Sequence, residues 1–301
     1  MTVRITPRTT QVMAIDNLSR TLGRMAQLQE QLASGRSLNR PSDSPIQTVE
    51  AMQYRSEIRR NDQFQRNAND GLNWLGMADN TLTGVLSTLG RIKELSIQGL
   101  NGSADAVQRG NIAEEVIALR DTLIGQANTK YLDRPIFGGN SNGSVAYDLT
   151  TGDFVGSPGD EIERRVGPNQ KVRVNLTGPE VFGTDDPVNT NGNLFQVVEQ
   201  IIDDLQGSNP QNLKVALAAL DIRRVAVENQ LGTVGARYNQ VDGMKTRAED
   251  QQVTMKNGLS EVENIDLPKT IVDLQLQEIA YKSALSATSR VIQPSLLDFL
   301  R

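Results

Sequence analysis

Asp185-Asp186 and Asp203-Asp204 are pairs of adjacent carboxylates, which are side chains that could bind a divalent cation. Calcium-binding loops space their oxygen ligands at alternate positions. Neither pair has that spacing, and we interpret both as solvated acidic surface. The chain has no cysteine and no histidine, so zinc sites and Ser-His or Cys-His nucleophiles are not expected. The sequence predicts no catalytic, cofactor or metal site, and an enzyme is the least favoured class.

Glycine-rich segments and glycosylation triplets also give no firm site. "GSPGDE" and "GGNSNGS" lack the following Lys and the strand-to-helix context of a phosphate-binding loop. Asn142-Gly143-Ser144 and Asn175-Leu176-Thr177 match the N-glycosylation pattern, which arises often by chance. The net charge of -5 and the pI near 5.0 give no nucleic-acid footprint.

The composition favours an elongated helical protein. The 301 residues are long enough for two or three domains, but only 4% are aromatic, which is few for a rounded core. No run of about 18 apolar residues occurs, so we expect no membrane insertion. The first residues lack the apolar core of a cleavable secretory signal.

Short heptad patterns occur at both ends of the chain, where apolar residues alternate at spacings of three and four. Each pattern predicts a narrow-striped helical rod, and isolated helices of this kind are marginal in water. The predicted assembly seam consists of Ile15, Leu18, Leu22, Met25 and Leu32 at the amino end, Ile271, Leu274, Tyr281, Leu285, Thr288 and Ile292 in the carboxyl rod, and the apolar residues Leu296, Leu297, Phe299 and Leu300 beyond it.

A polar connector, "LASGRSLNRPSDSP" at 32–45, follows the first rod. Gly35, Pro41 and Pro45 should stop the rod, and Ser42 and Asp43 can satisfy the free N–H groups that open the next helix. An ordinary interhelical loop explains the same residues. The predicted connector residues are Gly35, Asn39, Pro41, Ser42, Asp43 and Pro45.

Long helical patterns and one β-like segment fill the middle of the chain. Residues 137–192 are rich in Gly, Asn, Pro and Thr, with short alternating runs such as "KVRVNL". The predicted domains are a terminal coiled-coil assembly domain of 1–44 with 265–301, a long-helix bundle of 45–136 with 193–264, and a β-rich insert at 137–192. The fold is therefore predicted to be mainly α, an elongated antiparallel helical bundle or coiled coil formed by both chain ends, with a small β-rich inserted domain.

The two rods belong together because the two halves of the chain mirror each other. They should pair with each other, pair with neighbouring subunits, or stay disordered until a partner arrives. An intramolecular helical bundle explains the same periodicity.

Both ends resemble the flagellin family of bacterial axial proteins. "NLSRTLGRMAQLQEQLASGRSLNRPSDSP" resembles its amino-terminal signature, a heptad rod that ends in a Leu-x-Ser-Gly turn, and "YKSALSATSRVIQPSLLDFLR" resembles the carboxyl-terminal one. The resemblance covers about residues 10–100 and 210–301. "RPSDSP", "PIFGGN" and "SLLDFL" are more similar to the hook-associated protein 3 branch than to flagellins, which usually have Ala-Lys-Asp-Asp in place of "RPSDSP".

The resemblance implies a secreted structural protein of the bacterial flagellum that joins hook to filament. It implies self-association in a helical ring, with the paired terminal helices as an inner tube and the insert facing outward. Hook-associated protein 1 would lie on the hook side and flagellin on the filament side. An export chaperone would cover the carboxyl rod, and export would follow the flagellar type III pathway without a cleaved signal peptide. A short flagellin is the first alternative and a cytoplasmic coiled-coil adaptor the second.

Overall fold

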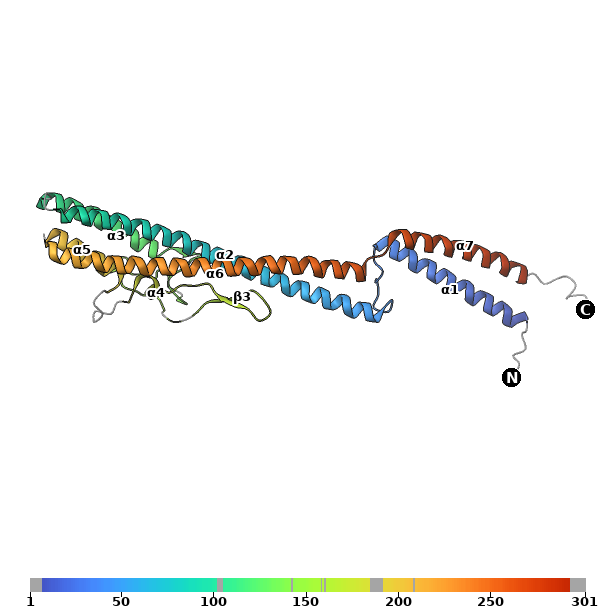
Figure 1. Ribbon diagram of the computed structural model, residues 1–301. Coiled ribbons are helices and arrows are strands. Elements are labelled where there is room, and N and C mark those ends of the chain that lie inside the picture. Colours follow the sequence, from blue (N-terminus) through green and yellow to red (C-terminus); the bar gives the residue numbers. More distant parts are fainter. Residues whose placement is uncertain are drawn as a thin grey trace, which may run out of the picture. The chain divides into compact units, whose positions relative to one another are not determined.

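The structure is a computed structural model that describes residues 7–101, 105–141, 143–157, 159, 161–184, 192–207 and 209–292 (Figure 1). These residues form seven helices and two short antiparallel hairpins. The prediction of a mainly α fold with a small β-containing region is confirmed. No helix in the described ranges is long and apolar enough to cross a bilayer.

The helices range from one short turn-like element to rods of more than fifty residues. In chain order they are α1 Pro7–Ser34, α2 Pro45–Leu100, α3 Ala106–Ala127, α4 Gly178–Phe182, α5 Leu194–Gln206, α6 Pro210–Glu263 and α7 Leu267–Ile292. The hairpins pair β1 Lys130–Tyr131 with β2 Arg134–Pro135, and β3 Glu163–Arg165 with β4 Lys171–Arg173.

Local sequence signals set several of the helix ends. Proline is the first residue of α2 and of α6, where its missing N–H group costs no helical hydrogen bond. The Asp105 carboxylate accepts a hydrogen bond of 2.7 Å from the Gln108 N–H in the first turn of α3. Asp266 caps α7 in the same way, through the Lys269 N–H at 3.1 Å. Gly35 ends α1 with a φ of 71°, which glycine adopts without strain.

The chain divides into two compact units. Unit 1 consists of residues 1–60 and 252–301, and unit 2 of residues 61–251. Both boundaries fall within long helices, so α2 and α6 contribute to both units. The three-part division drawn from the sequence stays a prediction.

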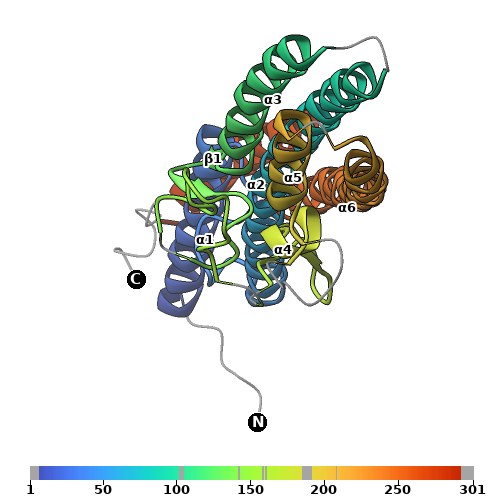
Figure 2. The same cartoon turned by 90° about the vertical axis from the view of Figure 1, so that its left-hand side faces the viewer.

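Unit 2 contains a continuous apolar core. Viewed along the helices, α2, α3, α5 and α6 lie together, with α4 and the hairpins beside them (Figure 2). Apolar residues at alternating spacings of three and four form one stripe of α2, and all of them are buried. They are Leu75, Ala78, Leu82, Val85, Leu89 and Ile92.

An aromatic cluster joins the insert to the core of unit 2. Phe182 of α4 contacts Phe137 edge-on with ring centroids 5.2 Å apart, and Tyr147 edge-on at 5.4 Å. Phe195 of α5 packs on Tyr147 at 4.9 Å. Such pairs add stabilisation beyond the apolar area that they bury. Few aromatic residues therefore suffice for this core, because they are concentrated at one place.

We predict that Phe182→Ala destabilises unit 2 by about 3–5 kcal/mol, the usual cost of deleting a fully buried phenyl ring. Urea unfolding followed by circular dichroism measures the change. Leu149→Ala is the matched control, because Leu149 is exposed, and its free energy of unfolding should change by less than about 0.5 kcal/mol. Equal losses in the two variants would show that the ring does not hold the insert.

Candidate assembly surface

Helices α1 and α7 lie side by side and antiparallel in unit 1 (Figure 1). Near the connector, the Ile265 N–H donates to the Gly35 carbonyl oxygen at 3.2 Å. Farther along the pair, the Gln277 side-chain amide donates to the Thr21 carbonyl oxygen at 3.4 Å. The second contact joins residues that are farther apart in sequence than those of the first, as expected for an antiparallel pair. The two terminal rods therefore pair with each other, as one of the alternatives drawn from the sequence states.

An inner stripe on each helix marks the contact between the rods. Its residues are less exposed than their neighbours, and they recur at spacings of four and three, as in a coiled coil. The inner stripe consists of Ala14, Leu18, Thr21, Met25, Leu28 and Leu32 on α1, and of Thr270, Leu274, Gln277, Tyr281, Ala284 and Thr288 on α7.

The seam predicted from large apolar residues combines this inner stripe with a second surface. Its members Leu18, Met25, Leu32, Leu274, Tyr281 and Thr288 are in the inner stripe. Its members Ile15, Leu22, Ile271 and Leu285 are exposed outside it. The side chain of Ile292 and the residues Leu296, Leu297, Phe299 and Leu300 lie outside what the structure describes. Sequence reasoning missed the small and polar members of the inner stripe. On α1, stepping along the chain from Ala14 by four and three residues in turn identifies them.

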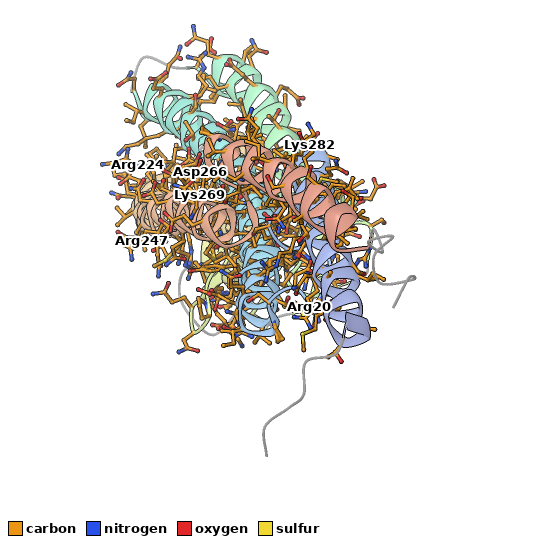
Figure 3. The ribbon with its side chains drawn as sticks, turned by 90° about the vertical axis from the view of Figure 1, so that its right-hand side faces the viewer. Arg20, Arg224, Arg247, Asp266, Lys269 and Lys282 are labelled. Carbon is orange, nitrogen blue, oxygen red and sulfur yellow. The ribbon has the colours of Figure 1, made fainter. Side chains whose placement is uncertain are left out.

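A second set of large apolar side chains on the two rods is uncovered, and we call it the outer apolar surface. Every member is at least 44% exposed, and Ile279 is 62% exposed. Charged side chains such as Arg20, Lys269 and Lys282 are exposed on the same helices (Figure 3). The outer apolar surface consists of Val12, Met13, Ile15 and Leu22 on α1, and of Leu267, Ile271, Val272, Leu276, Ile279 and Leu285 on α7.

Unit 1 lacks a core of its own in the part that the structure describes. Ala51 is its one fully buried apolar residue there, and every other buried apolar residue belongs to unit 2. Large exposed apolar surfaces on soluble monomers usually mark interaction sites. The outer apolar surface is therefore the candidate functional site.

The connector is tied to the end of α6 by hydrogen bonds. The Ser37 N–H donates to the Glu263 carbonyl oxygen at 2.7 Å, and the Ser37 hydroxyl donates to the Val262 carbonyl oxygen at 3.2 Å. Together with the hydrogen bond between Ile265 and Gly35, these contacts join the segment after α1 to the segment between α6 and α7. The connector therefore has a defined path and is not a free loop.

The predicted connector residues lie along this path. Asn39 is half-buried, and Pro41, Ser42 and Pro45 are exposed. The sequence predicts that Asp43 caps the helix that follows. Its carboxylate instead accepts hydrogen bonds from the Asn39 N–H at 3.1 Å and the Arg40 N–H at 2.8 Å, so it closes the turn before α2.

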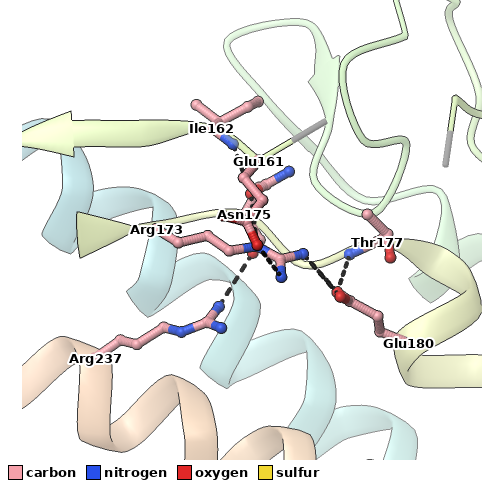
Figure 4. Close-up of polar contacts among 7 residues, drawn as sticks. All are labelled: Glu161, Ile162, Arg173, Asn175, Thr177, Glu180 and Arg237. Carbon is pink, nitrogen blue, oxygen red and sulfur yellow. Dashed lines mark hydrogen bonds and ion pairs between the residues drawn. The ribbon is translucent and has the colours of Figure 1, made fainter. Parts of the chain in front are cut away.

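A polar network fastens the insert to α6 within unit 2 (Figure 4). The Arg173 guanidinium donates to the Glu180 carboxylate at 2.7 Å, and the Thr177 N–H donates to the same group at 3.0 Å. Arg237 of α6 donates to the Asn175 carbonyl oxygen at 3.2 Å. Burial and the nearby Arg173 charge lower the pKa of Arg237. The network therefore connects the insert to α6 through Arg237, whose charged form is disfavoured by its partly buried surroundings.

The ionisation of Glu180 depends on the same contacts. Burial raises the pKa of Glu180, but the Thr177 N–H and the Arg173 guanidinium more than offset this, so that its pKa lies below the ordinary value of 4.5. The charged form of the carboxylate is thus favoured in the folded insert.

Other candidate sites fail on their geometry. Asp204 is buried on α5, where its carboxylate accepts from the Gln200 amide at 3.1 Å, so the interpretation of this pair as solvated is wrong for Asp204. No cluster of metal-ligating side chains occurs among the described residues. Asn175 is fully buried, which is incompatible with its use as a surface glycosylation acceptor. Asp185, Asp186 and Asn142 lie outside the described ranges.

Comparisons with known proteins agree with this arrangement. Residues 6–141 match the family described as the bacterial flagellin N-terminal helical region. The resemblance to the flagellin family is thereby confirmed. The matched residues include α1, the connector and α2, which supply half of the rod pair and one side of the unit 2 core.

Relatives that match most of this chain fall into two groups by name. A flagellar hook-associated protein 3 from Escherichia coli is 22% identical over 86% of this chain and 87% of its own length. A flagellar filament 30.7 kDa core protein from Treponema maltophilum is 27% identical over 85% of both chains. Among solved structures, a flagellar hook-associated protein from Vibrio parahaemolyticus shares the fold with a TM-score of 0.66 at 19% identity, over 74% of this chain and 100% of its own.

We predict that the inner stripe and the outer apolar surface respond differently to a charge. Leu274→Asp places a carboxylate between α1 and α7 and should reduce the helicity of the monomer, because an unpaired charge is costly there. Ile279→Asp, on the same helix but exposed, should leave helicity unchanged. Far-ultraviolet circular dichroism of the monomer measures both. A similar loss in both variants would contradict the division into two surfaces.

We predict that the insert loses stability in acid through Glu180. A depressed folded pKa means that the unfolded chain binds more protons, so the stabilisation is fully present above the unfolded pKa of about 4.5 and is lost as the pH falls through the folded pKa. Thermal unfolding between about pH 6 and pH 3 should show a smaller decrease in melting temperature for Glu180→Gln than for the parent chain. Glu228→Gln, an exposed control on α6, should follow the parent.

Proposed function

We propose that the chain is a structural protein of the bacterial flagellum that joins the hook to the filament and assembles through the outer apolar surface of α1 and α7. The observation that carries this proposal is the lack of a core in the described part of unit 1, beside ten exposed large apolar side chains on the two rods. Neighbouring copies supply the missing cover.

The energetics support association through this surface. Full burial of one Val, Leu, Ile or Met side chain contributes about 1.5–3 kcal/mol. The summed free energy of burying several such side chains exceeds the cost of ordering a partner only when they are buried together. Contacts that repeat in every copy make the assembly cooperative, while a single copy stays soluble through unit 2.

The proposed position of the chain between the hook and the filament determines its partners. Copies of the chain associate in a helical ring, hook-associated protein 1 lies on the hook side, and flagellin lies on the filament side. Before assembly, an export chaperone covers α7 and thereby keeps the outer apolar surface from aggregating. Export follows the flagellar type III pathway, and the assembled protein is extracellular.

A short flagellin is the second candidate, because a filament core protein also matches the chain over most of its length. The two candidates differ in where growth stops. A flagellin forms long filaments by itself when mixed with filament fragments, whereas a junction protein adds a limited zone to hook ends. A cytoplasmic adaptor is less favoured, because it would have its apolar stripes covered within the monomer.

We predict that cells lacking this chain make hooks but release flagellin into the medium. The parent chain should restore filaments, and Ile279→Asp should not, because the charge falls on the surface that a neighbour must cover. Leu149→Asp, a similarly exposed position in the insert, should restore them. Electron microscopy of cells and immunoblots of the medium measure the outcome. Filaments of normal length in the Ile279→Asp strain would contradict the proposal.

A further inference from the structure

A pocket of about 250 Å³ lies beside the connector in unit 1. Three arginines line it, namely Arg36, Arg40 and Arg55, together with one carboxylate, that of Glu263. The Glu263 side chain is only 8% exposed, and it makes an ion pair of 2.6 Å with Arg55. The one buried acid of the pocket is therefore already neutralised by one of the three arginines.

The other two arginines leave the pocket with excess positive charge. Arg40 approaches Glu30 at 3.4 Å, but both side chains are largely exposed, and ion pairs of this kind contribute little. Arg36 makes no ion pair with any side chain that the structure describes. A carboxylate is the natural ligand for two guanidinium groups at one pocket, because it accepts charge-assisted hydrogen bonds from both.

The rest of the pocket wall contains the polar residues Asn39 and Thr48 and several apolar ones. Leu38 and Pro41 come from the connector, and Met52 comes from α2. Met52 is exposed, and so are Ile46 and Val49 on the preceding turns of the same helix. A ligand that matches this pocket carries one carboxylate with large apolar groups on either side.

The chain itself contains a segment of that composition. Residues 295–300 read "SLLDFL", in which Asp298 is the one acid and stands between Leu297 and Phe299. We propose that the pocket beside the connector binds residues 295–300 of a second copy, with Asp298 between Arg36 and Arg40. This proposal rests on the assembly described above.

The occupant must come from another copy because of the length of α7. This helix has 26 residues, which at about 1.5 Å each carry the chain about 39 Å away from the connector. Asp298 follows Ile292 by only six residues, which span at most about 20 Å when fully extended. The segment therefore cannot return to its own pocket.

The antiparallel rod pair has two different ends, so the proposed contact joins one end of a copy to the other end of its neighbour. The connector is at one end of the pair, and α1 begins and α7 ends at the other (Figure 1). An open helical assembly requires two different surfaces on each copy, one of which receives the other. The pocket and the segment at the opposite end of the rod provide such a pair.

A binding experiment tests the proposal without assembly. A fluorescently labelled peptide of residues 293–301 is titrated with the full-length chain at a concentration at which it is monomeric, and anisotropy reports binding. We expect binding that weakens at least ten-fold with Arg36→Glu/Arg40→Glu, and also with Asp298→Asn in the peptide. Arg20→Glu is the matched control, since Arg20 is exposed on α1 outside the pocket lining (Figure 3), and it should bind as the parent does. No binding, or equal binding by the pocket and control variants, overturns the proposal.

Disulfide trapping in assembled protein tests the same contact. The chain has no cysteine, so Pro41→Cys with Ser295→Cys introduces the two thiols that can react. Mild oxidation should link neighbouring copies in this double variant, but not when Ser19→Cys, on the exposed side of α1, replaces Pro41→Cys. If copies assemble and no 41–295 link forms, the pocket proposal is wrong and the proposed function stands. If the peptide binds but no ring forms, the proposed function fails by itself.

Discussion

The structure depends on an unequal distribution of apolar burial between the two units. Unit 2 buries its seam residues and a compact aromatic cluster, so it can fold from its own side chains. In the described part of unit 1, one alanine is fully buried and ten large apolar side chains of the rods face solvent. Because hydrophobic stabilisation is proportional to the area removed from water, contacts with other molecules would add the burial that the described part of unit 1 lacks. The proposed function follows from this imbalance.

The connector links that imbalance to the rest of the chain. Its backbone hydrogen bonds join Gly35 and Ser37 to the residues at the end of α6. The segment after α1 and the segment between α6 and α7 therefore form one small structure. The carboxylate of Asp43 closes the next turn. A segment that the sequence marks as a polar connector is thus held by several hydrogen bonds. The path of the chain between the rods and the long helices is therefore specified by the backbone itself.

The sequence predicted the helices well because their periodic apolar positions repeat over many turns. The buried positions from Leu75 to Ile92 follow such a spacing, and two predicted connector residues, Gly35 and Pro45, lie at the end of α1 and at the start of α2. The division of the rods into an inner stripe and an outer surface could not be predicted from large residues. Ala14 and Thr21 take contact positions on α1 that Ile15 and Leu22 would be expected to fill. The burial of Asp204 depends on the packing of α5, and Asp43 bonds to N–H groups that precede it in the chain; spacing alone encodes neither.

The composition of the inner stripe has a thermodynamic consequence. Half of its members are Ala, Thr or Gln, so separating α1 from α7 exposes less apolar area than a seam of large apolar residues alone would. The heat-capacity change of a transition scales with the apolar area that it exposes. Opening of the rod pair therefore has a small heat capacity and a shallow dependence on temperature, whereas unfolding of unit 2 has a large one. One chain thus combines a rod pair whose opening depends weakly on temperature with a body whose stability depends on it strongly.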